Sequence, residues 1–227
     1  MQIAPETGLS GFVAGADTEV SLGRSLYKTR LKRGLDLVLA VLILPAMIPI
    51  ILGLYIMTRR DGGPGFFGHT RIGQNGRAFK CWKIRTMVPD AQAVLAQHLA
   101  DNPAAAAEWA RDFKLDKDPR VTRIGRFLRS SSLDELPQLW NVIRGEMSFV
   151  GPRPVTSAEL PKYSGHEASY LSVKPGITGL WQVSGRNDID YDQRVRMDAA
   201  YVRSMSLQSD LSILARTVMV VLRRNGK

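Results

Sequence analysis

The longest apolar stretch of the chain covers residues 37–57, LVLAVLILPAMIPIILGLYIM, and contains no charged side chain. A helix rises about 1.5 Å per residue, so this stretch is long enough to span the hydrocarbon core of a bilayer. Basic residues lie just before and just after it, and positive charge favours the cytoplasmic side of a membrane. Pro45 and Pro49 lie near its middle, where each removes a backbone donor and bends a helix. The pattern predicts a membrane helix that is broken at its prolines.

Basic flanks at both ends and prolines in the middle favour a re-entrant helix, which enters and leaves the membrane on the cytoplasmic face. The alternative is a spanning helix with tolerated proline kinks, which is common in membranes. Around this helix the chain divides into a flexible tail of residues 1–27, the membrane-inserted helix of residues 28–60 and a cytoplasmic domain of residues 61–227. The tail mixes small, polar and acidic residues without a lasting period.

Beyond residue 60 the pattern is typical of a small, helix-rich α+β domain. Within residues 68–87 two strand-like segments flank Asn75-Gly76, the favoured pair of a type I′ turn, and predict a β-hairpin. Helices are predicted over residues 89–115, with a break near Asn102-Pro103, and over residues 122–129, 133–144, 156–172, 190–204 and 209–223. The predicted fold class is therefore α+β, with a proline-broken membrane helix followed by a small catalytic domain that contains a β-hairpin.

Charge narrows the range of partners. The chain of 227 residues has 31 Lys and Arg against 21 Asp and Glu, a formal net charge of +10. This excess favours an anionic partner, which could be nucleic acid, an acidic membrane surface or a phosphorylated substrate. The basic residues are scattered through Gly- and Pro-rich loops and no nucleic-acid-binding motif occurs, so we expect no nucleic-acid partner. The single cysteine, Cys81, excludes an internal disulfide framework and a zinc site built from several cysteines.

The adjacent carboxylates Asp134 and Glu135 stand at the start of a predicted helix. With Ser132 they match a capping box, so their role could be structural. The helix dipole would also keep a first-turn aspartate ionised, as a carboxylate nucleophile requires. Arg129 precedes the pair, and Arg153 lies in a stiff Gly-Pro-Arg-Pro loop. Forked guanidinium groups bind phosphate, so this group of residues suits attack on a diphosphate, with Mg²⁺ to screen the anionic repulsion.

Further basic residues lie in strands and loops. Lys83 and Arg85 alternate on the second predicted strand, and Arg186 follows a glycine in QVSGRN. Each of them alone is more typical of a solvated surface charge than of a binding residue. Trp140 is expected to pack against the core, because its predicted helix is amphipathic.

Several segments together resemble the bacterial sugar transferase family, the monotopic phosphoglycosyl transferases, also called polyprenyl-phosphate hexose-1-phosphate transferases. The segments are KRGLDLVLA, the proline-broken apolar stretch, KIRTM, SLDELPQLWNVIRGEMSFVGPRP, KPGITGLWQVSGRN and YVRSMSLQSDLSIL. They cover about residues 30–223 in the family's order. The chain is most similar to the galactosyl- or glucosyl-1-phosphate transferases that start exopolysaccharide repeat units.

The resemblance implies a two-step reaction. Asp134 would attack the β-phosphate of UDP-galactose or UDP-glucose, releasing UMP and leaving a phosphosugar on the enzyme. Undecaprenyl phosphate, a polyprenyl phosphate, would then take the phosphosugar in the first membrane step of exopolysaccharide synthesis. Glu135 would hold Mg²⁺ or help to activate the lipid phosphate. The residues implied in binding phosphate or nucleotide are Arg129, Arg153, Lys83, Arg85 and Arg186.

The resemblance also implies a location in the bacterial inner membrane, among its lipids, with the catalytic domain facing the cytoplasm. Family members break their re-entrant helix at a proline, which points to Pro45 here. Many members have serine before that proline, whereas this chain has Leu44, and this leaves Pro49 as a second candidate for the break. The oligomeric state is left open, with a homodimer as one option. A different class, a membrane-anchored basic module that binds acidic lipid or nucleic acid, has the net charge alone in its favour.

Overall fold

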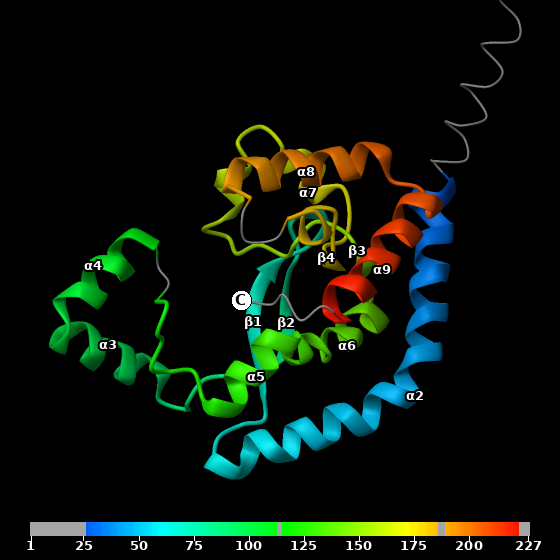
Figure 1. The fold of residues 1–227 in the computed structure, drawn as a ribbon. Helices are drawn as coiled ribbons and strands as arrows, with labels where there is room; N and C mark the ends of the chain where they lie inside the picture. Colours follow the sequence, from blue (N-terminus) through cyan, green and yellow to red (C-terminus); the bar gives the residue numbers. More distant parts are fainter. Residues whose placement is uncertain (1–25, 113–114, 186–188, 223–227) are drawn as a thin grey trace, which may run out of the picture.

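A computed structural model of the chain describes residues 26–112, 115–185 and 189–222 (Figure 1). The α-helices are α2 (Lys32–Thr58), α3 (Ala91–Asp101), α4 (Pro103–Asp112), α5 (Arg123–Ser131), α6 (Gln138–Arg144), α7 (Glu167–Leu171), α8 (Tyr191–Ser204) and α9 (Leu207–Leu222). The strands are β1 (Phe66–Ile72), β2 (Ala78–Ile84), β3 (Ser148–Val150) and β4 (Gly176–Thr178). Short 3₁₀ segments connect them, among them η2 (Arg59–Asp61), η4 (Leu133–Glu135), η5 (Leu160–Tyr163) and η6 (Trp181–Val183). The predicted helix-rich α+β fold is confirmed.

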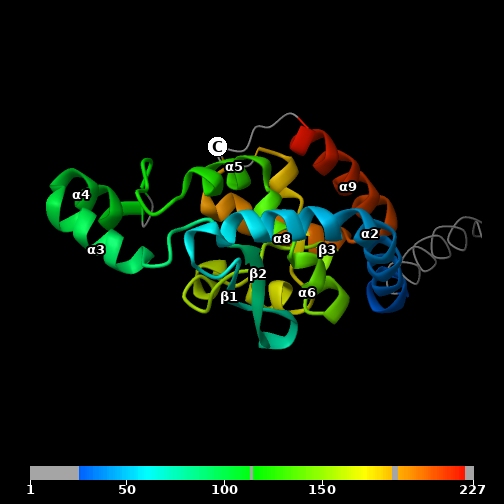
Figure 2. The ribbon, with the colours of Figure 1, turned by 90° about the horizontal axis from the view of Figure 1, so that it is seen from below.

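The long apolar helix α2 bends sharply near its middle, as the views in Figures 1 and 2 both show. Both prolines of the apolar stretch lie inside this helix, and each removes one backbone hydrogen bond. Within the described residues it is the one helix that is long and apolar enough to cross a membrane. Most of its apolar side chains are exposed, including Leu42 and Ile48, which is consistent with membrane association.

Buried polar contacts hold the N-terminal end of α2 on the domain. The ammonium group of Lys32 forms an ion pair with Asp210 on α9, and the hydroxyl groups of Tyr27 and Tyr201 donate to the same carboxylate. One turn further along α2, Asp36 accepts hydrogen bonds from a hydroxyl and a backbone N–H of β3 at 2.9 and 3.0 Å. Every charge in this group has a partner, as burial requires.

Removing one partner of this buried pair should destabilise the fold. Asp210→Asn is expected to lower the free energy of unfolding by about 3 to 5 kcal/mol, because it leaves the Lys32 ammonium buried without its counter-ion. Asp192→Asn is the matched control, since Asp192 is exposed in the first turn of α8 and its loss costs about 1 kcal/mol or less. Thermal unfolding in detergent measures both, and equal stability of the two variants would contradict a structural role for the pair.

The predicted β-hairpin is confirmed. Strands β1 and β2 pair antiparallel, with Phe66 opposite Ile84 and Ile72 opposite Ala78. The turn residues Asn75 and Gly76 have φ values of 57° and 75°, and the N–H of the next residue donates back across the turn. These are the features of a type I′ turn.

The parallel pair of β3 and β4 was not predicted, because each strand has three residues and carries no alternating pattern. The strands lie so close that a Cβ on Gly176 would come within 2.1 Å of the backbone nitrogen of Gly151. Parallel strands present their carboxyl ends at the same edge. The loop that carries Arg153 and the turn that carries Trp181 therefore leave the sheet side by side.

Two predicted helices are found only in part. Residues 156–172 form the 3₁₀ segment η5 and the short helix α7, separated by Ser164 and Gly165 with φ values of 38° and 82°. Residues 133–144 begin as the 3₁₀ segment η4, and α6 starts only after Pro137. The other predicted helices are found as α3 and α4, α5, α8 and α9, with ends shifted by a few residues.

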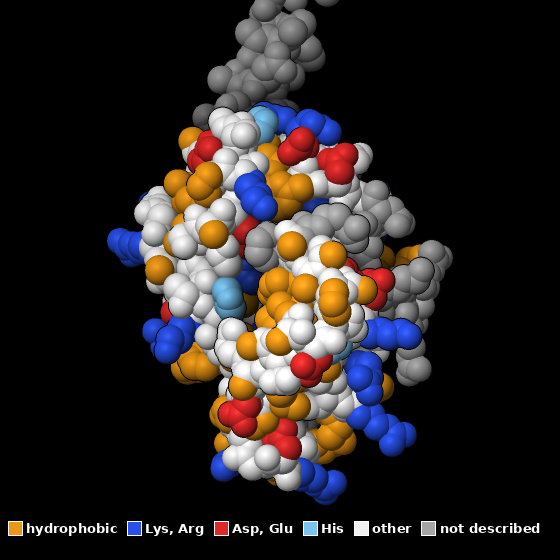
Figure 3. All heavy atoms as spheres, turned by 90° about the vertical axis from the view of Figure 1, so that its left-hand side faces the viewer, with side chains coloured by type: hydrophobic (Ala, Val, Ile, Leu, Met, Phe, Trp, Pro, Cys, Tyr) orange, Lys and Arg blue, Asp and Glu red, His pale blue; other side chains and the backbone are white. Residues whose placement is uncertain are grey.

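The main core cluster lies between α6, β3, α8 and α9, and includes Val142, Met147 and Tyr201. Trp140 does not join it: its side chain is 54% exposed and faces a groove beside α2, so the expected packing in the core is wrong. On the face that carries α3 and α4, Lys and Arg side chains are scattered among hydrophobic and acidic ones and form no single basic patch (Figure 3).

Candidate active site

The carboxylate pair lies in a tight turn between α5 and α6. Ser132 ends α5 in a left-handed conformation with φ 57°, and its N–H donates to the carbonyl oxygen of Arg129. Its side chain forms no capping hydrogen bond, so the alternative of a capping box is not supported. The chain then tightens into η4, which contains Asp134 and Glu135. The Asp134 residue is only 7% exposed, an unusual degree of burial for an aspartate.

Lys83 on β2 contacts both carboxylates. Its Nζ lies 2.7 Å from Oε1 of Glu135 and 3.6 Å from Oδ2 of Asp134. Burial disfavours the charged ammonium group, but the two carboxylates together raise the pKa of Lys83 above its usual value. The lysine is thus held charged beside the pair.

Burial raises the pKa of Asp134 above its usual value, while the charges of Lys83 and Arg129 oppose that shift. The sequence had suggested that a helix dipole keeps this group ionised. The structure shows a different cause. Asp134 lies in a 3₁₀ turn, and the basic side chains of Lys83 and Arg129 provide the compensating charge. A buried aspartate of this kind is a strong nucleophile once ionised, because little water solvates it.

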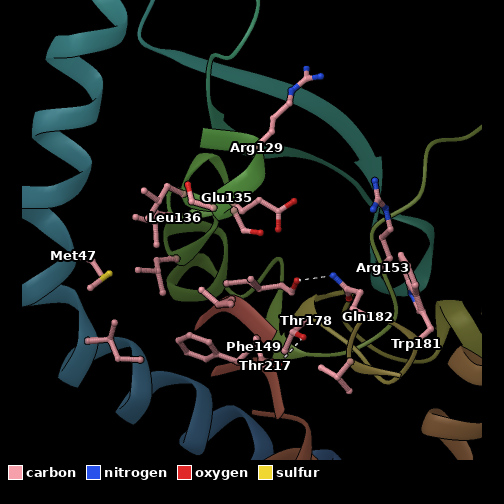
Figure 4. A pocket seen from close by; sticks show the side chains of 18 residues that line it. Met47, Arg129, Glu135, Leu136, Phe149, Arg153, Thr178, Trp181, Gln182 and Thr217 are labelled. Carbon is pink, nitrogen blue, oxygen red and sulfur yellow. Dashed lines mark hydrogen bonds between the residues drawn. The ribbon is translucent and has the colours of Figure 1, made fainter. Parts of the chain in front are cut away.

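A cavity of about 390 Å³ opens beside the pair (Figure 4). Its charged lining residues are Arg129, Glu135 and Arg153. The guanidinium group of Arg153 lies 5.9 Å from the centre of the Trp181 ring, and that of Arg194 lies 4.7 Å from the same ring. Stacking on a buried aromatic ring restricts the motion of the Arg153 side chain and preorganises its charge.

The structure brings together most of the residues singled out from the sequence. Glu135 and Arg153 line both the large cavity and a small adjoining pocket that Lys83 also lines, and Arg129 lines the large cavity. The Nε of Arg129 donates to the Thr86 hydroxyl at 2.9 Å, which leaves its terminal nitrogens for other acceptors.

Arg85 lies elsewhere. Its guanidinium group donates to the Asp61 carboxylate and to the carbonyl oxygens of Thr58, Pro64 and Met87. These contacts fasten the C-terminal end of α2 to the hairpin. The implied role of Arg85 in binding phosphate stays a prediction. Arg186 lies outside the described residues.

Two features of the site were not predicted from the sequence. Arg194 on α8 stacks on Trp181 from a helix with no motif to mark it. Thr178 and Thr217 hydrogen-bond to each other at 2.8 Å across the cavity wall, joining β4 to α9. No motif marks Thr217 either, because it is one of several polar residues in the last predicted helix, after Asp210, Ser212 and Arg216.

The side chains at the site provide only some of the ligands that a metal ion needs. Among the described residues no three His, Cys, Asp or Glu side chains gather at one place. Asp134 and Glu135 provide two carboxylates, and Glu135 already accepts a hydrogen bond from Lys83. Mg²⁺ is often bound by one or two carboxylates together with substrate phosphates and water. The pair therefore fits a magnesium ion that arrives with, or is completed by, a phosphorylated substrate.

Comparison with known proteins identifies the family: residues 27–224 match the bacterial sugar transferases, and the chain belongs to this family. A UDP-galactose-lipid carrier transferase of Erwinia amylovora is 55% identical over 196 residues, which cover 86% of this chain and 41% of the relative. An undecaprenyl-phosphate galactose phosphotransferase of Salmonella typhimurium is 53% identical, with the same coverage. The exopolysaccharide production protein ExoY of Sinorhizobium fredii is 50% identical over 86% of this chain and 87% of its own length. The chain thus spans about two fifths of the first two relatives and most of the third.

Proposed function

We propose that the protein transfers a hexose 1-phosphate from a UDP-sugar to undecaprenyl phosphate and releases UMP. The observation that carries this proposal is one cavity with two kinds of wall. The carboxylate and arginines at one end suit a phosphorylated substrate, and side chains of α2 at the other end suit a lipid. The names of two relatives, a UDP-galactose-lipid carrier transferase and an undecaprenyl-phosphate galactose phosphotransferase, support both substrates.

In the first step a carboxylate oxygen of Asp134 attacks the β-phosphorus of the UDP-sugar. A bond forms between that oxygen and phosphorus, the bond from phosphorus to the bridging oxygen breaks, and UMP leaves with the electron pair. Arg129 and Arg153 neutralise the charge on the phosphate oxygens, and the charge of Lys83 favours the ionised form of Asp134 against the effect of burial.

In the second step an oxygen of undecaprenyl phosphate attacks the same phosphorus, and the bond to Asp134 breaks. The product is a lipid-linked diphosphosugar, and the aspartate returns as a carboxylate. One phosphate linkage is exchanged for another in each step, so catalysis consists mainly of positioning and charge stabilisation. Bound Mg²⁺ would supply further positive charge at the diphosphate, with Glu135 as its protein ligand.

The arrangement of α2 supports a re-entrant helix and a cytoplasmic active site. The N-terminal end of α2 contacts Asp210 on α9, and η2 at its C-terminal end is fastened by Arg85 of the hairpin. Both ends thus lie on the same domain. Such a helix dips into one leaflet and presents the cavity to the nucleotide sugar in the cytoplasm and to the lipid in the membrane.

The test is an assay of purified protein in detergent with Mg²⁺, undecaprenyl phosphate and either UDP-galactose or UDP-glucose. We expect UMP release together with a lipid-linked diphosphosugar for at least one of the two sugars, and the better substrate identifies the hexose. A membrane-anchored binding module would release no UMP, and that outcome with both sugars would contradict the proposal.

The pH dependence of UMP release should reveal how the charge of Lys83 affects the ionisation of Asp134. Asp134 must be ionised to attack, and the Lys83 charge lowers its pKa, so Lys83→Met is expected to raise that pKa. The acid limb of UMP release then moves to higher pH. The exposed Lys80 on the same strand is the matched control, and Lys80→Met should leave the limb in place. An unmoved limb in Lys83→Met would show that a different group controls it.

A further inference from the structure

The apolar half of the active-site cavity leads from Glu135 to the membrane helix. In Figure 4 Met47 on α2 lies at the opposite side of the cavity from Arg153 and Trp181. The apolar lining comes from α2, η4 and the residue after it, α6, β3 and α9, and includes Ile43, Met47, Leu136, Leu139, Phe149 and Val221. Charged and apolar walls therefore meet within one continuous space of about 390 Å³.

The mouth of this apolar half faces outward between α2 and α9. Ile43 is 36% exposed and Val221 is 41% exposed, although both line the cavity. The side chain of Met219, two residues before Val221 on α9, is exposed and apolar as well. An opening framed by exposed apolar side chains beside a membrane helix suits a ligand that extends into lipid.

A second groove beside α2 differs in chemistry. It has about 420 Å³, lies on the other side of Leu136 and Leu139, and is lined by Ile48, Trp82 and Trp140 among other apolar residues. No charged side chain is among its described lining residues. This groove could hold a hydrocarbon chain but has nothing to bind a phosphate. Of the two spaces, the first alone joins a phosphate-binding end to an apolar end.

We infer that the first isoprene units of the polyprenyl acceptor lie in the apolar half of the first cavity, between α2 and α9. This inference rests on the proposed function. The acceptor phosphate then lies near Arg129 and Arg153, and the chain passes Met47 and Val221 on its way to the bilayer. The cavity is at the small end of ligand pockets, so the remainder of the long chain stays in lipid. The last described helix, α9, thereby becomes part of the acceptor site.

Bulky substitutions at the two ends of this passage test the inference. Met47→Trp and Val221→Trp are expected to raise the KM for undecaprenyl phosphate about tenfold or more, the effect of removing roughly two methylene groups from an apolar site. Labelling of Asp134 by UDP-sugar without lipid precedes acceptor binding and should stay within about twofold of wild type. The same rise in KM is expected with a short acceptor of two isoprene units, because the site contacts only the start of the chain.

Matched controls place the same tryptophan outside the cavity. Leu42→Trp on α2 and Val218→Trp on α9 alter side chains that are 70% and 60% exposed and line neither space, and their KM should equal that of wild type. Ile48→Trp obstructs the second groove. A rise in KM for Ile48→Trp alone would overturn the inference and place the chain in that groove. Failure of wild-type protein to label at all would instead contradict the proposed function.

Discussion

Asp134→Asn is expected to reduce UMP release by a factor on the order of 10⁴ or more while the protein remains folded. The amide has the size of the carboxylate but no oxyanion to attack phosphorus. Stability should not suffer, because burial already disfavours the charge of Asp134 and raises its pKa. Lys83 retains its hydrogen bond to Glu135 at 2.7 Å. A catalytic loss without a loss of stability separates a nucleophile from a structural carboxylate.

The decisive measurement is capture of the intermediate. Wild-type protein incubated with Mg²⁺ and labelled UDP-sugar, without lipid acceptor, should carry label on the peptide that contains Asp134, and Asp134→Asn should carry none. Asp192→Asn, an exposed position on α8, should label as wild type does. Near-normal turnover by Asp134→Asn, or label on another peptide, would exclude the covalent mechanism proposed for this residue.

Local signals in the sequence predicted the elements that depend on a few neighbouring residues. Asn75 and Gly76 tolerate positive φ, and this alone determines the hairpin turn. Asp190 caps α8 with a hydrogen bond to the N–H of Gln193, so that helix begins where its pattern does. The apolar length and prolines of α2 are likewise visible without any tertiary contact.

What the sequence could not predict depends on residues far apart in the chain. Lys83 and Glu135 are 52 positions apart, and only the fold places them in contact. The Ser-x-x-Glu pattern fits a capping box equally well, but Pro137 delays α6 and Ser132 closes the preceding helix instead. In the sequence Arg85 looks the same as an arginine that binds phosphate. In the structure its guanidinium group donates hydrogen bonds to the Asp61 carboxylate and to nearby carbonyl oxygens.

The local pattern had already grouped Asp134 with Arg129 and Arg153, and the family resemblance added the two-step reaction and its substrates. The structure brings both arginines and Glu135 to one cavity, which is a property of tertiary geometry. Their roles in the reaction stay predictions until the variants are measured. The apolar half of the cavity could not be predicted from the sequence, because its lining comes from elements that are far apart in the chain, from α2 to α9.

Cysteines placed on the two sides of α2 are expected to show that both lie in the cytoplasm. In a Cys81→Ser background, which removes the buried native thiol, Leu26→Cys and Ser157→Cys introduce exposed sites before and after the helix. Both should be shielded from an impermeant thiol reagent in intact cells and labelled after permeabilisation. Labelling of Leu26→Cys alone in intact cells would mean that α2 spans the membrane.

The structural reason for this expectation is that both ends of α2 contact one domain. A straight helix of 27 residues would be roughly 40 Å long, and its ends could not both reach that domain if it crossed the bilayer. Crossing would also carry the basic residues before α2 through the hydrocarbon core at about 2.5 to 3.5 kcal/mol each on insertion scales.

Replacing Pro45 and Pro49 together by leucine tests the bend itself. Leucine restores the missing backbone donors and favours a straight helix. Straightening would separate the Lys32–Asp210 pair at one end of α2 from the Arg85–Asp61 pair at the other, so one of these ion pairs must break. We therefore expect the double variant to unfold at a lower temperature and to aggregate in detergent, whereas Leu42→Ala, an exposed change on the same helix, should be close to wild type. A double variant with wild-type stability and activity would show that the prolines do not set the bend, and that contacts of the domain alone hold α2 in its bent form.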